Sequence, residues 1–168
     1  MKRLNQLTTL KLLNILLLGM AVLSSLKLLI LGLTVDEEYA VTMSYRMATG
    51  DQMFLSMWEP HQTSGFVTAL FIRLFLLVRP NLDYLVIYLR LVGLILQSCV
   101  ALFVYNTLKH KYSKQTSFLG GMLVFVLLPK WILTPEFSDL LLWSSVCTVM
   151  CLLRVVWGDD RRDLHLIL

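Results

Sequence analysis

Charged residues are scarce in this chain of 168 residues. Only 15% of the residues are Asp, Glu, Lys or Arg, whereas 57% are hydrophobic. Soluble domains carry about 25% charged residues, so this composition excludes an ordinary soluble domain and indicates a membrane protein. The net charge of +4 is informative mainly through its position along the chain, because lysine and arginine determine which loops stay on the inner side.

Cysteine is also scarce, and its placement excludes further classes. Cys99, Cys147 and Cys151 all lie in apolar runs. An odd, buried set argues against a disulfide framework and against a zinc site, so we expect these cysteines to be packing residues. We expect no cleavable signal peptide, because the first apolar run is too long for one and ends without a small-residue cleavage site.

Long apolar runs are abundant. About 20 helical residues cover the ~30 Å hydrocarbon core of a bilayer, and four runs approach that length: Leu12–Leu33, Tyr84–Leu108, Ser117–Leu133 and Leu140–Trp157. The segment Phe66–Val78 is shorter and carries Arg73 at its centre, which suits a partial or interfacial helix. The sequence therefore predicts an all-α polytopic membrane protein, a single transmembrane domain over residues 1–168. It has about four transmembrane helices, outer-face juxtamembrane helices and one short partial helix.

The distribution of basic residues favours this topology. With four spans and an inner N-terminus, the cluster Lys109–Lys114 and the pair Arg161-Arg162 lie inside. Both would move outside if Phe66–Val78 crossed the membrane, against the positive-inside rule. The same topology places residues 34–82 on the outer face, as a loop with juxtamembrane helices.

The densest acidic cluster, Asp36–Glu38, directly follows the first apolar run. Thr34 and Glu37 have the spacing of a capping box, in which Glu37 bonds back to the Thr34 amide, and the helix should run to Thr49 and end at Gly50. Acidic residues in a first turn are stabilised by the helix dipole, so a structural role would suffice. Chemistry would instead need a partly desolvated carboxylate that faces a cavity. The sequence is compatible with both roles.

A series of short motifs occurs in a fixed order along the chain. They are the acidic pair Asp36-Glu37, the turn Gly50-Asp51, the loop Pro60-His61-Gln62 with Gly65-Phe66, the pair Arg90-Leu91 and the acid Asp139. In this order they resemble the N-terminal part of the C-type polytopic membrane glycosyltransferases. That family includes the protein O-mannosyltransferases and the lipid A aminoarabinose transferases.

The resemblance implies transfer of a sugar from a polyprenyl-phosphate carrier to an acceptor hydroxyl on the outer face. It implies catalytic roles for Asp36, Glu37 and Asp139, with the first acid as general base or as a ligand that helps place a divalent cation such as Mg²⁺ or Mn²⁺. Glu136 is an alternative to Asp139. The carrier phosphate would be held by basic side chains, namely Arg90, Arg73 and His61. The implied location is the cell (inner) membrane of a bacterium, with a cytoplasmic N-terminus.

Arg90 calls for an anionic partner on physical grounds, because it lies about two turns inside an apolar run and a lone charge there is costly. Asp36, Asp139 and the carrier phosphate are the expected partners. A structural interpretation is that Arg90 extends outward to the membrane surface.

The chain departs from the resembled family in length, because full-length members are several times longer. A new apolar run begins at the C-terminal segment DLHLIL, so we expect a missing C-terminal half or a partner subunit, and activity of the chain alone stays open. Two other classes remain. One is a non-catalytic assembly partner or regulator whose acids only cap a helix. The other is a lipid-binding or transport module in which Lys27, Arg73 and Arg90 line a polar path.

Overall fold

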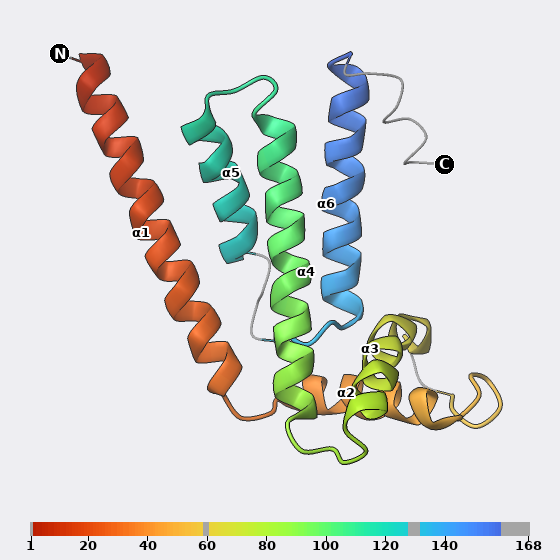
Figure 1. Cartoon of the computed structure of the whole chain (residues 1–168). Coiled ribbons are helices and arrows are strands. Elements are labelled where there is room, and N and C mark those ends of the chain that lie inside the picture. Colours follow the sequence, from red (N-terminus) through yellow and green to blue (C-terminus); the bar gives the residue numbers. More distant parts are fainter. Residues whose placement is uncertain (1, 59–60, 128–131, 159–168) are drawn as a thin grey trace. The chain divides into compact units, whose positions relative to one another are not determined.

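The computed structural model describes residues 2–58, 61–127 and 132–158, and this part of the chain is helical without any strand (Figure 1). The helices are α1 (Lys2–Ile30), α2 (Val35–Thr49), the 3₁₀ turn η1 (Gln62–Ser64), α3 (Gly65–Val78), α4 (Leu85–Leu108), α5 (Lys114–Leu127) and α6 (Phe137–Val156). Three of the helices described, α1, α4 and α6, are long and apolar enough to cross a membrane. The predicted all-α membrane fold is confirmed.

The third predicted span, Ser117–Leu133, forms a helix over only part of its length. Helix α5 has 14 residues and ends at Leu127, and the chain at residues 132–136 is not helical. Leu133 and Thr134 are nonetheless buried, and the Leu133 carbonyl lies directly against Gly93 of α4, where no side chain intervenes. Non-helical backbone is tolerated within a membrane only where protein covers it. Residues 132–135 are buried and so are covered by protein.

Helix α3 is the predicted partial helix. It has 14 residues, too few to cross a bilayer core. The chain enters this region after Leu31 and leaves it into α4, and Arg90 of α4 donates a hydrogen bond to the Leu31 carbonyl. The chain therefore begins and ends its passage through α2 and α3 at neighbouring points.

The chain forms two compact units. The first comprises Met1–Ser25, Gln97–Pro129 and Leu142–Leu168, and the second comprises Leu26–Leu96 and Lys130–Leu141.

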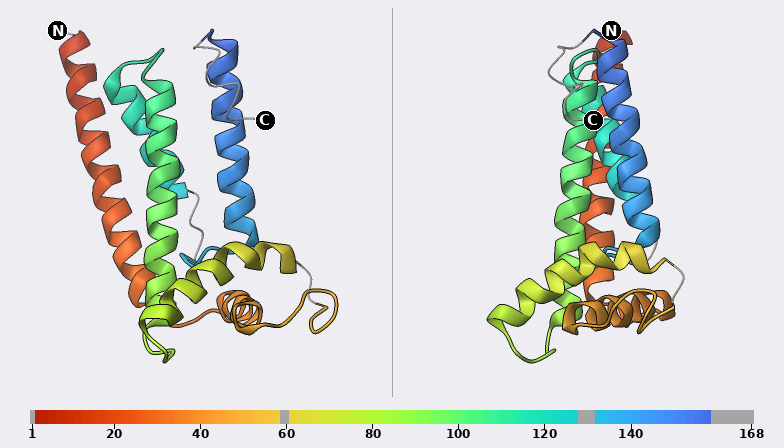
Figure 2. Two further views of the ribbon diagram at one scale, coloured as in Figure 1. Left: turned by 45° about the vertical axis from the view of Figure 1, so that its right-hand side comes forward. Right: turned by 90° about the vertical axis from the view of Figure 1, so that its right-hand side faces the viewer.

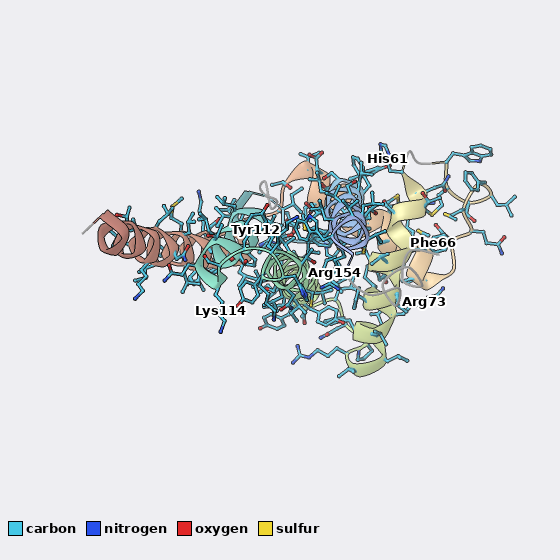
Figure 3. The ribbon with its side chains drawn as sticks, turned by 90° about the horizontal axis from the view of Figure 1, so that it is seen from above. His61, Phe66, Arg73, Tyr112, Lys114 and Arg154 are labelled. Carbon is cyan, nitrogen blue, oxygen red and sulfur yellow. The ribbon has the colours of Figure 1, made fainter. Side chains whose placement is uncertain are left out.

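Inside the first unit, polar side chains are paired with one another. The Gln97 amide donates to the carbonyls of Val124 and Phe125 and accepts from the Trp143 indole. Arg154, labelled in Figure 3, donates to the Thr107 hydroxyl at 3.0 Å. Such pairing is required because an unsatisfied polar group in an apolar interior is costly.

The second unit is built on the packing of α2 against α3, which lie across the direction of the first turns of α4 (Figures 1 and 2). One cluster joins Met43 and Met47 of α2 to Met57 and Ala69. A second cluster joins α3 to α4 through Ile72, Phe75, Leu85 and Leu89, and it is covered by one face of α2. This second unit contains all the residues that the sequence singled out as functional.

Candidate functional site

The start of α2 is fixed by its cap. The Thr34 hydroxyl accepts a hydrogen bond from the Glu37 amide at 3.3 Å, and Gly50 ends the helix with a φ of 120°. These two predicted boundaries are confirmed. The second half of the predicted capping box is wrong, because the Glu37 carboxylate turns inward to other partners instead of bonding back to Thr34.

Glu37 forms a buried ion pair with Arg90. The guanidinium Nε and Nη2 donate to the two carboxylate oxygens at 2.8 and 2.6 Å, and the two residues are 1% and 5% exposed. The Thr134 hydroxyl donates to the same carboxylate at 2.7 Å. A two-pronged arginine–carboxylate pair of this kind is among the stronger polar contacts in proteins, and it fixes the first turn of α2 to α4.

Arg90 also binds the end of α1. Its remaining N–H groups donate to the carbonyls of Leu29, Leu31 and Gly32, at 3.1, 2.6 and 3.2 Å. The last carbonyls of a helix lack partners within the helix and carry partial negative charge, so a cation is well placed there. A guanidinium has five N–H donors, and all five are used within this unit.

The anionic partner of Arg90 is therefore Glu37, and neither Asp36 nor Asp139 takes that place. Helical geometry explains the choice, because Glu37 shares the buried face of α2 with Ala40, Ser44 and Met47, whereas Asp36 lies about 100° around the helix. A carrier phosphate could reach Arg90 only by replacing one of the five hydrogen bonds. The predicted phosphate contact at Arg90 stays a prediction.

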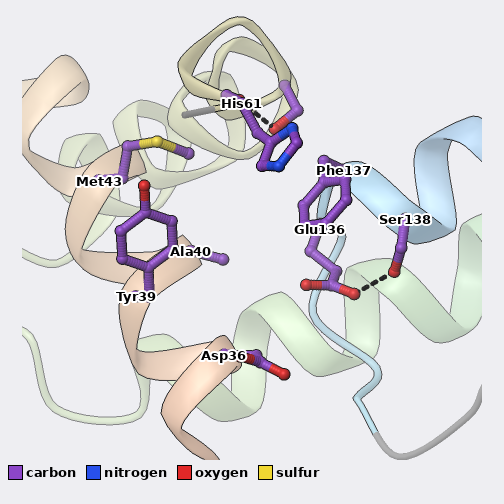
Figure 4. Close-up of a pocket in the computed structure, with 9 residues that line it drawn as sticks. Asp36, Tyr39, Ala40, Met43, His61, Glu136, Phe137 and Ser138 are labelled. Carbon is purple, nitrogen blue, oxygen red and sulfur yellow. Dashed lines mark hydrogen bonds between the residues drawn. The ribbon is translucent and has the colours of Figure 1, made fainter. Parts of the chain in front are cut away.

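Asp36 is exposed and lines a pocket of about 260 Å³. Figure 4 shows its carboxylate at one side of the opening, with Glu136 and Ser138 opposite. The other lining residues are Tyr39, Ala40, Met43, His61, Ser64 and Phe137. The pocket thus combines two carboxylates, hydroxyl groups and aromatic rings, a mixture suited to a polyhydroxylated ligand that needs both apolar contacts and hydrogen bonds.

The loop that precedes α3 forms the wall around His61. Its imidazole stacks on the Phe137 ring at a centroid separation of 4.0 Å, and its backbone has a φ of 61°, which is uncommon for a residue other than glycine. The Ser64 hydroxyl donates to the His61 carbonyl at 2.7 Å. The sequence placed His61 in a functional loop with Pro60, but Pro60 lies outside the described residues.

Of the two candidates for a second acid, Glu136 is the one that lines the pocket. Its carboxylate accepts a hydrogen bond from Ser138. Asp139, which the sequence favoured, is 4% exposed in the first turn of α6 and does not line the pocket. The preference for Asp139 rested on its position at the helix start, a signal that also fits a residue whose role is to stabilise that helix end.

Arg73 lies at the opposite end of α2 from Asp36. It donates to the carbonyls of Ala48 and Met47 at 3.2 and 3.3 Å, and Figure 3 shows it farther along α3 than His61 and Phe66. From Asp36 to Met47 the helix rises roughly 16 Å. In this arrangement Arg73 and Asp36 cannot both contact the reacting atoms of one sugar transfer.

In the part of the chain that the structure describes, no three His, Cys, Asp or Glu side chains lie together in a group that could hold a metal ion. The only carboxylates that line the pocket are Asp36 and Glu136. The divalent cation therefore stays a prediction from the resemblance, and no step of the proposed mechanism depends on it.

Thr134 is one of the residues that the sequence analysis missed, together with Tyr39, Ser64 and Phe137 of the pocket. Thr134 lies beside Pro135, just after an apolar run, and its carboxylate partner Glu37 lies 97 residues earlier in the chain. No family model, no curated protein and no solved structure matches this chain. The fold defines its class as a helical membrane protein.

Proposed function

We propose that the chain is a membrane glycosyltransferase, or the N-terminal part of one. It would move a sugar from a polyprenyl-phosphate donor to an acceptor hydroxyl on the outer face of a bacterial cell membrane, with its N-terminus in the cytoplasm. The observation that carries the proposal is the pocket in which exposed Asp36 faces hydroxyl and aromatic side chains. This pocket lies in the same unit as the ends of two apolar helices, α1 and α4.

In this mechanism Asp36 is the general base. Its carboxylate takes the proton of the acceptor hydroxyl while the acceptor oxygen forms a bond to C1 of the sugar. The bond between C1 and the carrier phosphate breaks, and the phosphate leaves with the electron pair. Because Asp36 is exposed, it returns its proton to water after the transfer.

His61 is the proposed contact for the leaving phosphate, since it is the basic side chain that lines the pocket. Stacking on Phe137 holds its ring in one orientation, and a ring N–H can donate to a phosphate oxygen. Tyr39 and Phe137 supply apolar surface for the sugar ring, while Ser64, Ser138 and Glu136 supply hydrogen-bonding groups.

Glu37 and Arg90 are proposed to position Asp36 rather than to touch substrate. Their ion pair fixes the first turn of α2 against the end of α1 and the start of α4, so the neighbouring Asp36 carboxylate is held at the pocket. Pre-organisation of this kind lowers the entropy that must be lost when reactants align.

The test is transfer of radiolabelled sugar from polyprenyl-phosphate donors in membranes that contain the chain. Asp36→Asn should abolish transfer while leaving expression and helix content close to those of the parent. Glu38→Gln is the matched control, because Glu38 lies in the same turn and is exposed, but does not line the pocket; it should retain transfer.

A specific observation favours the second candidate, a non-catalytic membrane protein. Glu37 is fully used in holding helices together, so one acid of the cluster needs no chemistry. If the acids are only structural, Asp36→Asn and Glu38→Gln should behave alike, each costing about 1 kcal/mol or less of stability. Near-normal transfer by Asp36→Asn would remove the catalytic role.

A further inference from the structure

A second pocket, of about 460 Å³, lies beyond the far end of α2 from Asp36. One part of its wall is polar and comprises Arg73, Asp51 and Gln52. The other part is apolar and comprises Met47, Met53, Phe66, Ala69 and Leu70. A pocket divided in this way suits an amphiphile whose charged group meets one wall and whose hydrocarbon meets the other.

Arg73 has capacity left for a ligand. Two of its N–H bonds are made to the carbonyls that end α2, whereas a guanidinium has five donors. Its other N–H groups have no partner within the described part of the chain. An arginine with free donors at the edge of an apolar wall is a suitable contact for a phosphate diester.

Asp51 has a carboxylate oxygen that is available to a cationic group of a ligand. Its Oδ2 accepts from Nε of Arg46 at 2.6 Å, and its side chain is 37% exposed. Among the described residues, none donates to its Oδ1. The pocket therefore presents one free cationic group and one free carboxylate oxygen.

The apolar wall continues onto the outer face of α3. Phe66 and Leu70 line the pocket, and Leu74 and Leu77 follow them at helical spacing, all four of them exposed. The neighbouring turn exposes Phe54, Leu55 and Trp58, and tryptophan is typical of the interface between bilayer and water. Because α1 and α4, whose ends belong to this unit, are apolar enough to span, a bilayer surface is the expected neighbour of this face.

We propose that this pocket binds one glycerophospholipid with a primary-amine headgroup. The phosphate accepts hydrogen bonds from Arg73, the ammonium donates to Oδ1 of Asp51, and an acyl chain lies along Phe66, Leu70, Leu74 and Leu77. The pattern of free groups selects this class, because an anionic headgroup brings no positive charge to Oδ1 of Asp51 and a trimethylammonium headgroup has no N–H to donate. The site is separate from Asp36 and does not depend on sugar transfer.

The experiment is native mass spectrometry of the delipidated full chain with equal amounts of phosphatidylethanolamine, phosphatidylcholine and phosphatidylglycerol of the same acyl length. We expect about tenfold tighter binding of phosphatidylethanolamine than of the other two lipids, the value of one charge-assisted hydrogen bond. Glycerophosphoethanolamine, which lacks acyl chains, should bind at least about tenfold more weakly. Equal binding of the three lipids, preference for phosphatidylglycerol, or full retention of the chainless headgroup would each overturn the proposal.

Two variants locate the site. Arg73→Gln should lower the binding of all three lipids, and Asp51→Asn should abolish only the preference for the amine headgroup. The matched controls are Arg79→Gln, whose guanidinium lies over the Tyr84 ring, and Asp83→Asn, whose carboxylate accepts from Asn81. Neither lines the pocket, and both should bind as the parent does. Parent-like binding by Arg73→Gln would refute the assignment. The lipid preference of the parent tests the proposal independently of any variant that fails to fold.

Discussion

Arg90 places a full charge about one and a half turns inside the apolar helix α4. Every N–H group of its guanidinium has a hydrogen-bond acceptor in the surrounding chain. A carboxylate neutralises it, and three backbone carbonyls accept the N–H groups that the carboxylate leaves over. The pairing is strong only as a whole, because removing one partner leaves the other buried without compensation. Glu37 and Arg90 should therefore be energetically coupled.

A double-mutant cycle tests this coupling. Arg90→Leu and Glu37→Leu should each lower the free energy of unfolding by about 3–5 kcal/mol, whereas the double variant should recover much of that loss. Thermal unfolding of the detergent-solubilised chain, followed by circular dichroism, measures the three values. Arg90→Lys is the informative intermediate, since an ammonium has three donors for five acceptors. Additive losses in the double variant would show that the pair is not coupled.

Sequence reasoning reached part of this residue-level arrangement. It placed Arg90 in a span and required an anionic partner, and it placed Asp36 in the first turn of a helix. It did not select Glu37 as the partner, because the choice depends on which face of α2 is buried, and that is set by residues from α3 and α4 distant in sequence. The buried face of α2 does follow helical spacing, because Glu37, Ala40, Ser44 and Met47 are three or four residues apart.

At the scale of elements, close approach of backbones shapes the second unit. Gly93 of α4 lies against the carbonyl of Leu133, and a Cβ at this position would collide with that carbonyl. The non-helical segment before α6 can contact α4 at this point only because Gly93 has no side chain. This contact brings Thr134 within reach of the Glu37 carboxylate.

Gly93→Ala should therefore destabilise the chain, by about 1–3 kcal/mol, as an overpacked site does. Gly19→Ala in α1 is the matched control, because nothing lies within 4 Å of the position its Cβ would take. That substitution should be neutral or stabilise by up to about 1 kcal/mol, the gain in helix propensity. Midpoints of thermal unfolding compare the two, and equal midpoints would mean that the Leu133 segment moves aside at little cost.

Helix ends were the most predictable elements, and the third span was the least. Thr34 and Gly50 act through neighbouring backbone groups, so their sequence signals suffice. Ile132 and Leu133 are apolar enough to read as the end of a helix, yet they are not helical, and the Leu133 carbonyl lies against Gly93. Apolar composition reports that a segment is buried and does not report its backbone conformation.

At the scale of the whole molecule, the hydrogen bond from Arg90 to the Leu31 carbonyl bears on how the chain would cross a membrane. The excursion through α2 and α3 returns to the point from which it left. We therefore expect its two ends on one side of any membrane that α1 and α4 cross.

Single cysteines introduced into a chain free of Cys99, Cys147 and Cys151 test this arrangement. With a membrane-impermeant thiol reagent, Q52C and N81C should both label from outside, while S113C should label only after the membrane is opened. Helix α3 has too few residues to separate the first two positions across a bilayer. Labelling of N81C from the inner side alone would mean that α3 crosses.

The Glu37–Arg90–Thr134 contacts also impose an order in time. Glu37 precedes Arg90 by 53 residues and Thr134 by 97. At synthesis rates of about 5–20 residues per second, the carboxylate exists for roughly 3–10 s before the guanidinium is made, and for roughly 5–20 s before the threonine hydroxyl. The arginine therefore reaches the translocation machinery with its counter-charge already synthesised, and the hydroxyl completes the carboxylate's set of partners last.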